Sequence, residues 1–483
     1  MLIRQTMLYL PAQLLGPLAQ LAGIVLWTHW LQPSDFGLFT LAIAAQEAVY
    51  LLFLFFWSQF LLRFLSGADE GLRQKVDVIE MWVFFANCIL QVIVLFGLLC
   101  FVLPAWPSAS LLATLFVFTF TRSYCTHLSE RAKVSEAIGI YTVLQTVGPV
   151  VGLLIGCVWA RLSTPGPEQV LAAYAIAQIV SLVIAIPRLR WYPRLKQPDS
   201  TVLRRACLYG LPLAASGLLA WVPANGIRFV IGHGMGIAAV GLFSVGWALG
   251  QRACAFSSML VTAAAFPIAL RLEADGKHEE ALQQLSLNGA LLCAVLLPTA
   301  MGLIVLAEPM MQAMISRQYI AVTLAILPLA TMAGMVKNLR SHFINQPFLL
   351  AQKTALTLAI DVLETLALLV GVAIGLHFMG LVGAAWGALI AALIGALVSF
   401  FIAVYKLSMP VPGAHLAKIT LATLVMGAVL HLLPPFAGWP RLIAAVILGG
   451  VVYTVTLALC YLDRLADLRT AWSTRALKKE REI

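Results

Sequence analysis

Residues 89–103, ILQVIVLFGLLCFVL, and residues 366–376, LALLVGVAIGL, decide the fold class because, apart from Gln91, they are continuously apolar. A helix needs about 20 apolar residues to cross the hydrocarbon core of a bilayer, and similar stretches recur along the whole chain. The chain is 61% hydrophobic and only 11% charged, whereas soluble domains are about 25% charged. Membrane barrels alternate apolar and polar residues, which these stretches do not. The sequence therefore predicts an all-α, polytopic membrane protein.

The apolar stretches predict about 14 membrane-spanning helices, with short polar connections between them. The first stretch is too long for a signal-peptide core and is expected to remain as a helix. The predicted spans are 8–31, 36–60, 79–103, 108–127, 138–160, 169–187, 206–231, 237–263, 284–307, 320–349, 355–377, 380–405, 415–433 and 441–461.

The distribution of lysine and arginine orients these spans. Most of the 31 basic residues fall on the side of the N-terminus, whereas Arg161, Arg317 and Arg441 fall on the other side. Because cytoplasmic loops carry the excess of basic residues, both termini are predicted to be cytoplasmic, in a bacterial inner membrane. The connections on the opposite side, such as 31–36 and 104–110, are short. Function is therefore expected within the membrane.

An internal repeat predicts the domain organisation. DFGLFTLAIAAQEA (35–48) resembles AVGLFSVGWALGQRA (239–253), with Gly37 matching Gly241, 204 residues later. Two six-helix copies that both start in the cytoplasm are related by a parallel pseudo-twofold repeat. The predicted domains are an N-terminal lobe (1–190), a basic linker (191–205), a C-terminal lobe (206–406), two extra spans (407–462) and a basic tail (463–483).

Charged side chains inside spans are the candidate functional residues, because ionisable groups are costly in hydrocarbon. Arg228 and Arg252 lie in the seventh and eighth spans, and the tenth contains KNLRSHFINQ (337–346). Arginine binds phosphate oxygens in pairs and lysine binds them as a point charge, so these cations fit an anion such as a pyrophosphate. The predicted substrate-binding residues are Arg228, Arg252, Lys337, Arg340, Asn225 and Asn345. The alternative is internal pairing, for example of Arg340 or Lys337 with Glu364.

The intramembrane acids are the candidate coupling-ion residues: Glu47, Asp361 and Glu364. Arg63 and Arg122 lie near span ends, where long side chains reach the interface, and are interpreted as anchors. In the tail, Leu465, Leu468 and Trp472 fall on one helical face. This face either lies on the anionic lipids of the inner leaflet, or the basic tail anchors the protein without recognising a specific lipid. The histidines have no metal-ligand spacing, so we expect no metal and no cofactor.

Several segments resemble the polysaccharide transporter family of the multidrug/oligosaccharidyl-lipid/polysaccharide exporter superfamily. The matching segments are LQPSDFGLFTLAIAAQEA (31–48), FLLRFLSG (60–67), RFVIGHGMGIAAVGLFSVGWALGQR (228–252), AAFPIALRLEADG (264–276) and GLVGAAWGALIAALIGALVSFFIAVYK (380–406). The resemblance implies two lobes with alternating access around a cationic cavity. Arg228 falls where the family commonly has an arginine, but Ile227 replaces the acid that often precedes it.

The resemblance implies a flippase that moves a polyprenyl-pyrophosphate-linked oligosaccharide repeat unit to the outer leaflet for surface polysaccharide synthesis. Two alternatives share the fold: a peptidoglycan-precursor flippase and a cation-coupled small-molecule exporter. An enzyme is not expected, since the outer connections are too short for a catalytic site. The expected partners are the lipid-linked substrate, membrane lipids and a glycan polymerase or assembly complex, and no nucleic acid.

Overall fold

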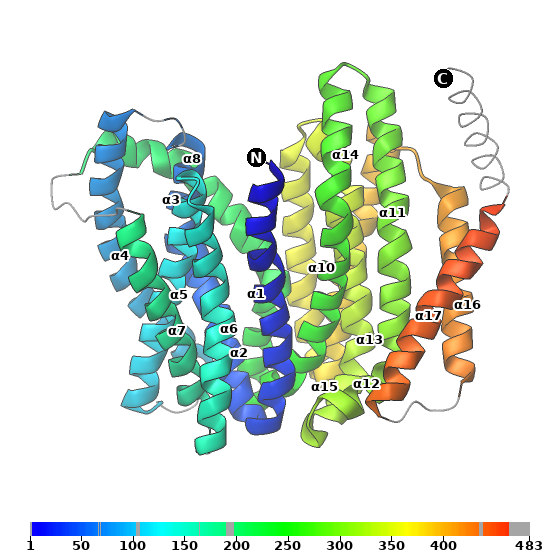
Figure 1. Cartoon of the computed structure of the whole chain (residues 1–483), viewed down its shortest axis with the longest axis horizontal. Coiled ribbons are helices and arrows are strands. Elements are labelled where there is room, and N and C mark those ends of the chain that lie inside the picture. The colour runs from blue at the N-terminus through cyan, green and yellow to red at the C-terminus, as the bar shows by residue number, and fades with distance from the viewer. Residues whose placement is uncertain are drawn as a thin grey trace, which may run out of the picture. The chain divides into compact units, whose positions relative to one another are not determined.

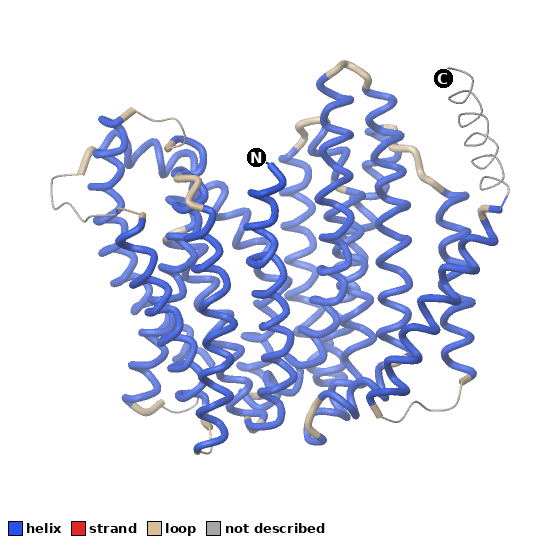
Figure 2. The backbone as a smooth tube through the Cα atoms, in the orientation of Figure 1, coloured by secondary structure: helices blue, strands red, loops and turns tan. Residues whose placement is uncertain are grey.

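The computed structural model describes residues 2–65, 67, 69–102, 107–163, 165–189, 198–433 and 438–462, without the side chains of residues 2–13, 260, 262–265 and 354. Helices make up nearly all of this part of the chain, and it contains no strand (Figure 2). Eleven of its helices are long and apolar enough to cross a membrane. The prediction of an all-α, multi-pass membrane protein is confirmed.

The chain forms two compact units. The first comprises residues 1–247, 315–326 and 361–391. Most of its helices are labelled in Figure 1, and its first segment ends at residue 247, within α10. In chain order they are α1 (Leu2–Trp30), α2 (Pro33–Phe53), α3 (Phe55–Phe64), α4 (Glu70–Val102), α5 (Ala109–Val134), α6 (Ile138–Leu162), α7 (Pro167–Arg188), α8 (Ser200–Trp221), η1 (Val222–Gly226), α9 (Ile227–Met235) and the first part of α10 (Ile237–Ala274).

The second unit comprises residues 248–314, 327–360 and 392–483. Three long helices, α10, α13 and α15, contribute to both units. After α10 the chain forms α11 (His278–Val305), α12 (Ala307–Met314), α13 (Arg317–Leu339), η2 (Arg340–Ile344), α14 (Gln346–Leu350), α15 (Thr354–Leu407), α16 (Gly413–Leu432) and α17 (Trp439–Cys460).

Large apolar side chains remain exposed where a soluble protein would bury them. On α4, Ile89 is 64% and Ile93 is 59% exposed, and on α15 Val370 is 59% exposed. Contiguous apolar exposure of this kind is rare in soluble proteins. These residues belong to the two stretches that predict the fold class, and lipid rather than water is the solvent that accommodates them.

Two predicted spans are helices that a π-turn interrupts. The span predicted at 206–231 is α8 and α9 joined by the π-helical turn η1, which contains Pro223. The span predicted at 320–349 is interrupted by η2, inside KNLRSHFINQ. Such π-turns are frequent at functional sites. Both fall among the candidate residues.

The predicted eleventh and twelfth spans both lie in α15, and the helix is kinked between them at Gly380. Gly380 has φ 61° and ψ −140°, a conformation essentially restricted to glycine. The count of fourteen spans stays a prediction, as do the lobe boundaries, because the two units follow packing rather than the repeat. The tail 463–483 and residues 190–197 of the linker region lie outside the described residues.

The core of the first unit centres on aromatic side chains. Trp27 of α1 is buried and donates its indole N–H to the hydroxyl of Tyr174 on α7, at 3.2 Å. Trp57 and Phe60 of α3 are buried and stacked, with ring centroids 5.4 Å apart. They pack against Ile79 of α4. These contacts join α1 to α7 and α3 to α4 within the first unit.

Candidate functional site

A chain of polar contacts in the first unit joins Glu47 to Asn225. Glu47 lies on α2, and its side chain is 39% exposed. The amide Nδ2 of Asn225, in the π-turn η1, donates a hydrogen bond to Oε2 of Glu47 at 2.9 Å. A π-turn widens the helix locally and redirects its side chains. The turn therefore places the Asn225 amide against a helix that is 178 residues earlier in the chain.

Arg228 continues this chain one turn further on, in α9. Its guanidinium donates a short hydrogen bond to Oδ1 of Asn225. Its Nε donates to the hydroxyl of Ser244 on α10, at 3.2 Å. Ser244 in turn lies 3.3 Å from the hydroxyl of Thr40 on α2. The sequence left the partner of Arg228 open, and the structure provides an amide and a hydroxyl among its partners.

Arg122 of α5 approaches Glu47 from the other side. Its Nη2 lies 3.9 Å from Oε1 of Glu47, and its Nε donates to Oε1 of Gln46 at 2.7 Å. Gln46 is buried and donates to the hydroxyl of Ser123 at 3.2 Å. Arg122 is only 25% exposed. Its contacts differ from those of the anchor predicted from the sequence, because its guanidinium is directed at neighbouring helices.

Glu47 thus lies between two arginines, one in direct ionic contact and one reached through Asn225. We call Glu47, Arg122, Asn225 and Arg228 the Glu47 cluster. Two guanidinium groups and one carboxylate carry a net charge of +1, and Glu47 is exposed enough to exchange partners. Arginine binds phosphate oxygens through its planar set of donors. An anionic ligand is therefore the chemistry that the cluster favours.

Sequence reasoning predicted Glu47, Asn225 and Arg228 but assigned Glu47 to a separate coupling-ion role. The structure brings the three together. It adds Arg122, Gln46 and Ser244, which the sequence analysis did not select. Gln46 precedes Glu47 on α2, so this adjacent polar pair inside an apolar span was the available signal.

Asp361 and Glu364, the other predicted coupling residues, lie on the part of α15 that belongs to the first unit. Glu364 is 5% exposed and Asp361 is half-buried. The backbone oxygen of Asp361 accepts a hydrogen bond from the Thr365 hydroxyl at 2.8 Å. Both side chains take part in further interactions within the protein. Their role in ion coupling stays a prediction.

The remaining predicted residues lie in the second unit. Arg340 opens η2, is 5% exposed and donates from Nε to the Ser399 hydroxyl at 3.1 Å. Asn345 ends the same π-turn, and its backbone N–H donates to the Arg340 carbonyl at 2.8 Å. Its side-chain oxygen is buried and lacks a hydrogen-bond partner among the described residues. Because a buried amide oxygen without a partner is costly, this position favours a bound water or ligand.

Arg252 and Lys337 are half-buried and also take part in interactions within the protein. Neither they nor Arg340 lie in the Glu47 cluster. Among the described residues, no group of three or more histidine, cysteine, aspartate or glutamate side chains is arranged to hold a metal ion.

Comparisons with known proteins agree with the fold. The sequence profile of a family described as "Polysaccharide biosynthesis protein" matches residues 2–273, more than half of the chain. No match was found among curated protein sequences.

Three solved structures share the architecture. The structure titled "Lipid II flippase MurJ, inward closed conformation" matches with TM-score 0.75 and 13% identity, over 95% of this chain and 100% of that chain. An inward-facing multidrug resistance transporter of the MATE family has TM-score 0.58 and 14% identity, over 81% of this chain and 94% of that chain. A MOP superfamily transporter from Pyrococcus furiosus has TM-score 0.53 and 14% identity, over 84% and 95%. The three titles name a flippase or a transporter, and the similarity to them shows the fold of this chain.

Proposed function

Because the chain belongs to the polysaccharide biosynthesis protein family, we propose that it is a flippase for a polyprenyl-pyrophosphate-linked oligosaccharide repeat unit. It carries the sugars and pyrophosphate from the cytoplasmic to the outer leaflet of the bacterial inner membrane, for surface polysaccharide synthesis. Both termini are then cytoplasmic, and a glycan polymerase or assembly complex receives the product.

The Glu47 cluster is the observation that supports this proposal most directly. The carboxylate of Glu47 accepts from Asn225 and lies beside Arg122. A pyrophosphate offers the two guanidinium groups more oxygens and more charge than one carboxylate, so it displaces Glu47 and engages Arg122 and Arg228. Exchange of one anion for another keeps the guanidinium groups compensated throughout, which avoids the cost of an unpaired charge in the membrane.

Transport then follows from this exchange. When the substrate leaves on the outer side, Glu47 returns to Asn225, and the empty site is stabilised again without a ligand. A ligand shifts a conformational equilibrium only through different affinities for the two states. The exchange of Glu47 for pyrophosphate provides that difference. Arg252, Lys337, Arg340 and Asn345 of the second unit are proposed as further substrate-binding residues, and Asp361 and Glu364 as coupling residues.

A peptidoglycan-precursor flippase is the second candidate. The similarity to the MurJ structure favours it, since that match extends over 95% of this chain and all of that one. Both candidates carry a lipid-linked pyrophosphate, so the Glu47 cluster serves either substrate. A cation-coupled exporter is a third candidate, and it requires a cavity in which acids rather than arginines meet the ligand.

The test is transfer of a fluorescent polyprenyl-pyrophosphate oligosaccharide across the bilayer of proteoliposomes, measured by its accessibility to an external quencher. We expect faster transfer than in liposomes with an unrelated membrane protein, and loss of this acceleration in Arg228→Ala. Lipid II in the same assay separates the two flippase candidates, because only the correct glycan accelerates. Absence of transfer for every lipid-linked glycan, together with export of cationic dyes, would refute the flippase.

A further inference from the structure

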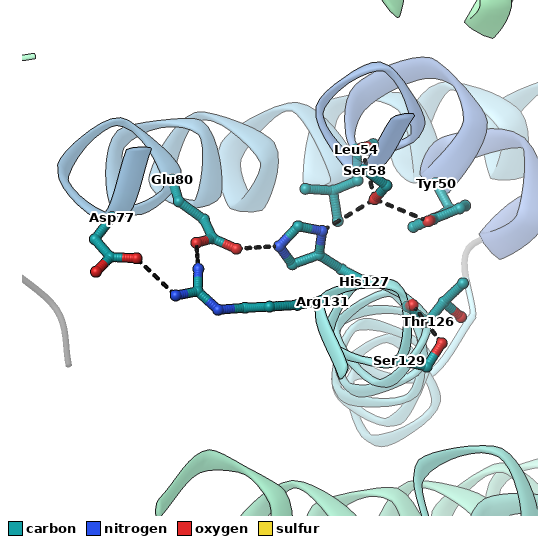
Figure 3. Close-up of polar contacts among 9 residues, drawn as sticks. All are labelled: Tyr50, Leu54, Ser58, Asp77, Glu80, Thr126, His127, Ser129 and Arg131. Atoms are coloured by element: carbon teal, nitrogen blue, oxygen red, sulfur yellow. Dashed lines mark hydrogen bonds and ion pairs between the residues drawn. The ribbon is translucent and has the colours of Figure 1, made fainter. Parts of the chain in front are cut away.

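A second polar network lies in the first unit, on the faces of α4 and α5 (Figure 3). Glu80 of α4 and His127 of α5 are each 1% exposed. Arg131 of α5 donates from Nη2 to Oδ1 of Asp77 at 2.6 Å, and from Nη1 to Oε2 of Glu80 at short range. Nε2 of His127 lies 2.5 Å from the other oxygen of Glu80, Oε1. Four ionisable groups therefore share one buried site.

The hydrogen-bond pattern fixes the tautomer of His127. Nδ1 of His127 lies 3.0 Å from the Ser58 hydroxyl, which also accepts from Tyr50 at 3.0 Å. The same hydroxyl donates to the carbonyl of Leu54 at 3.1 Å. Because a serine hydroxyl has only one hydrogen, Ser58 must accept from His127. Nδ1 is then the protonated nitrogen of the ring.

A neutral imidazole with its hydrogen on Nδ1 presents a lone pair at Nε2. That lone pair would face the carboxylate oxygen of Glu80, and two acceptors do not approach to 2.5 Å without a hydrogen between them. Charge leads to the same result. The charges of Asp77, Glu80 and Arg131 sum to −1, and burial of a net charge is costly. One added proton makes the site neutral.

We propose that Glu80 and His127 form a proton-binding site that holds one exchangeable proton between Oε1 and Nε2. Asp77, whose side chain is 23% exposed, links the site to solvent through Arg131. Deprotonation leaves a lone pair opposite a carboxylate, so the contact between α4 and α5 must lengthen. The proton thereby controls how these two helices pack.

Other charged groups around the site have partners elsewhere or point outward. On α5, Glu130 pairs with Lys133 at 2.8 Å, and on α4, Lys75 pairs with Asp199 at 2.9 Å. Arg63 of α3 is exposed, and Arg205 of α8 lies over the Phe64 ring at 4.3 Å. Tyr124 of α5 is buried and lies close enough to Glu80 to interact with it electrostatically. Since a tyrosine hydroxyl is neutral at about pH 7, the proton balance rests on the four ionisable groups of the network.

The proton site adjoins the Glu47 cluster. His127 follows Ser123 by one helical turn on α5, and Ser123 accepts from Gln46, which also accepts from Arg122. A shift of α5 on deprotonation would move Arg122 relative to Glu47. Coupling of the proton to transport rests on the proposed function, whereas proton binding does not.

Nitrogen-15 NMR of the full chain in nanodiscs, labelled at histidine, tests proton binding without any substrate. At about pH 7 we expect one histidine with both ring nitrogens protonated or sharing a proton, and its loss in His127→Gln assigns it. In Glu80→Gln the amide N–H replaces the shared proton, so His127 becomes a neutral ring with its hydrogen on Nδ1. A His127 that is neutral in the wild type, with its hydrogen on Nε2, would overturn the proposal.

Two further variants test the proposal without replacing the fully buried residues, whose substitution could disturb folding. Asp77→Asn lies at the partly exposed edge and removes one negative charge, so a smaller share of His127 rings should carry two protons at about pH 7 than in the wild type. Glu168→Gln, whose carboxylate accepts from Ser108 and Ser110 outside the network, should leave this share unchanged. Equal shares in Asp77→Asn and the wild type would contradict the charge balance. Normal transport by His127→Gln and Glu80→Gln would instead count against coupling and leave proton binding in the wild type unaffected.

Discussion

Gly37 of α2 and Gly241 of α10 pack backbone against backbone, and they are equivalent positions of the internal repeat. A Cβ on Gly37 would collide with the carbonyl oxygen of Ile237, and a Cβ on Gly241 with that of Pro33. Each carbonyl belongs to the residue four positions before the partner glycine. Such reciprocal contacts are those of a twofold interface. The contact therefore favours a predicted pseudo-twofold axis that passes between α2 and α10.

Gly37→Ala should destabilise the protein, because its Cβ would also lie 3.0 Å from the backbone nitrogen of Gly241. Overpacking of this kind costs about 1–3 kcal/mol. The midpoint of thermal unfolding in detergent measures the loss. The matched control is Gly97→Ala on α4, where a Cβ meets no atom within 4 Å. Equal melting temperatures for the two variants would argue against close packing at the axis.

Asn225→Leu should lower transport strongly while the protein stays folded. The substitution removes the link between Glu47 and Arg228, and hydrogen bonds to charged groups contribute about 1.5–3 kcal/mol, or roughly ten- to hundredfold. Initial rates in the proteoliposome assay measure the effect. Gln284→Leu is the control, because it removes an amide-to-amide bond to Asn288, of 2.9 Å, outside the cluster. Similar rates for both variants would exclude a special role for Asn225.

Arg340→Ala should reduce the amount of folded protein, because Arg340 is buried and its Nε bonds Ser399. Loss of this charged hydrogen bond costs about 1.5–3 kcal/mol. Arg252→Ala, at a half-buried position, should instead fold normally and lose transport. Size-exclusion profiles together with transport per folded molecule separate the two effects. Since Arg340 is also proposed to bind substrate, transport per folded molecule should fall in Arg340→Ala as well, and full transport per folded molecule would exclude it from the binding site.

Acid should weaken the start of α8 only at strongly acidic pH. Hydrogen bonds from Thr201 and the neighbouring charge of Lys75 hold the pKa of Asp199 well below its usual range. A lowered pKa stabilises the fold fully above the unfolded-state value of about 3.9, and the stabilisation is lost as the pH falls towards the lower folded-state value. Melting temperatures of the wild type and Asp199→Ala should therefore differ at neutral pH and converge in strong acid.

Asp199→Asn is the informative comparison for that series. Asparagine still caps the helix, since its oxygen accepts from the Thr201 backbone N–H as Asp199 does at 2.9 Å, but it carries no charge. Its melting temperature should lie between those of the wild type and Asp199→Ala at neutral pH. A difference between wild type and Asp199→Ala that grows in acid would reverse the assigned direction.

The Glu47 cluster could be predicted only in part from the sequence. Charged and amide side chains inside an apolar span can be recognised without a structure. Glu47, Asn225 and Arg228 were identified as candidates in this way. Their mutual contacts could not be predicted, because Glu47 and Asn225 are 178 residues apart. Arg122 lies near a predicted span end, where an arginine is usually interpreted as an anchor, so its contact with Gln46 was not predicted.

The sequence by itself determined that lipid surrounds most of the chain, that the fold is helical and that the sequence contains a repeat. These follow from local composition, because apolar stretches of span length must be helical in lipid. Only the tertiary structure decided which polar groups meet. Glu80 and His127 are unremarkable near the ends of their spans, yet packing of α4 against α5 buries both and sets them 2.5 Å apart. Contacts between distant segments depend on how helices rotate and pack, and no local pattern encodes that rotation.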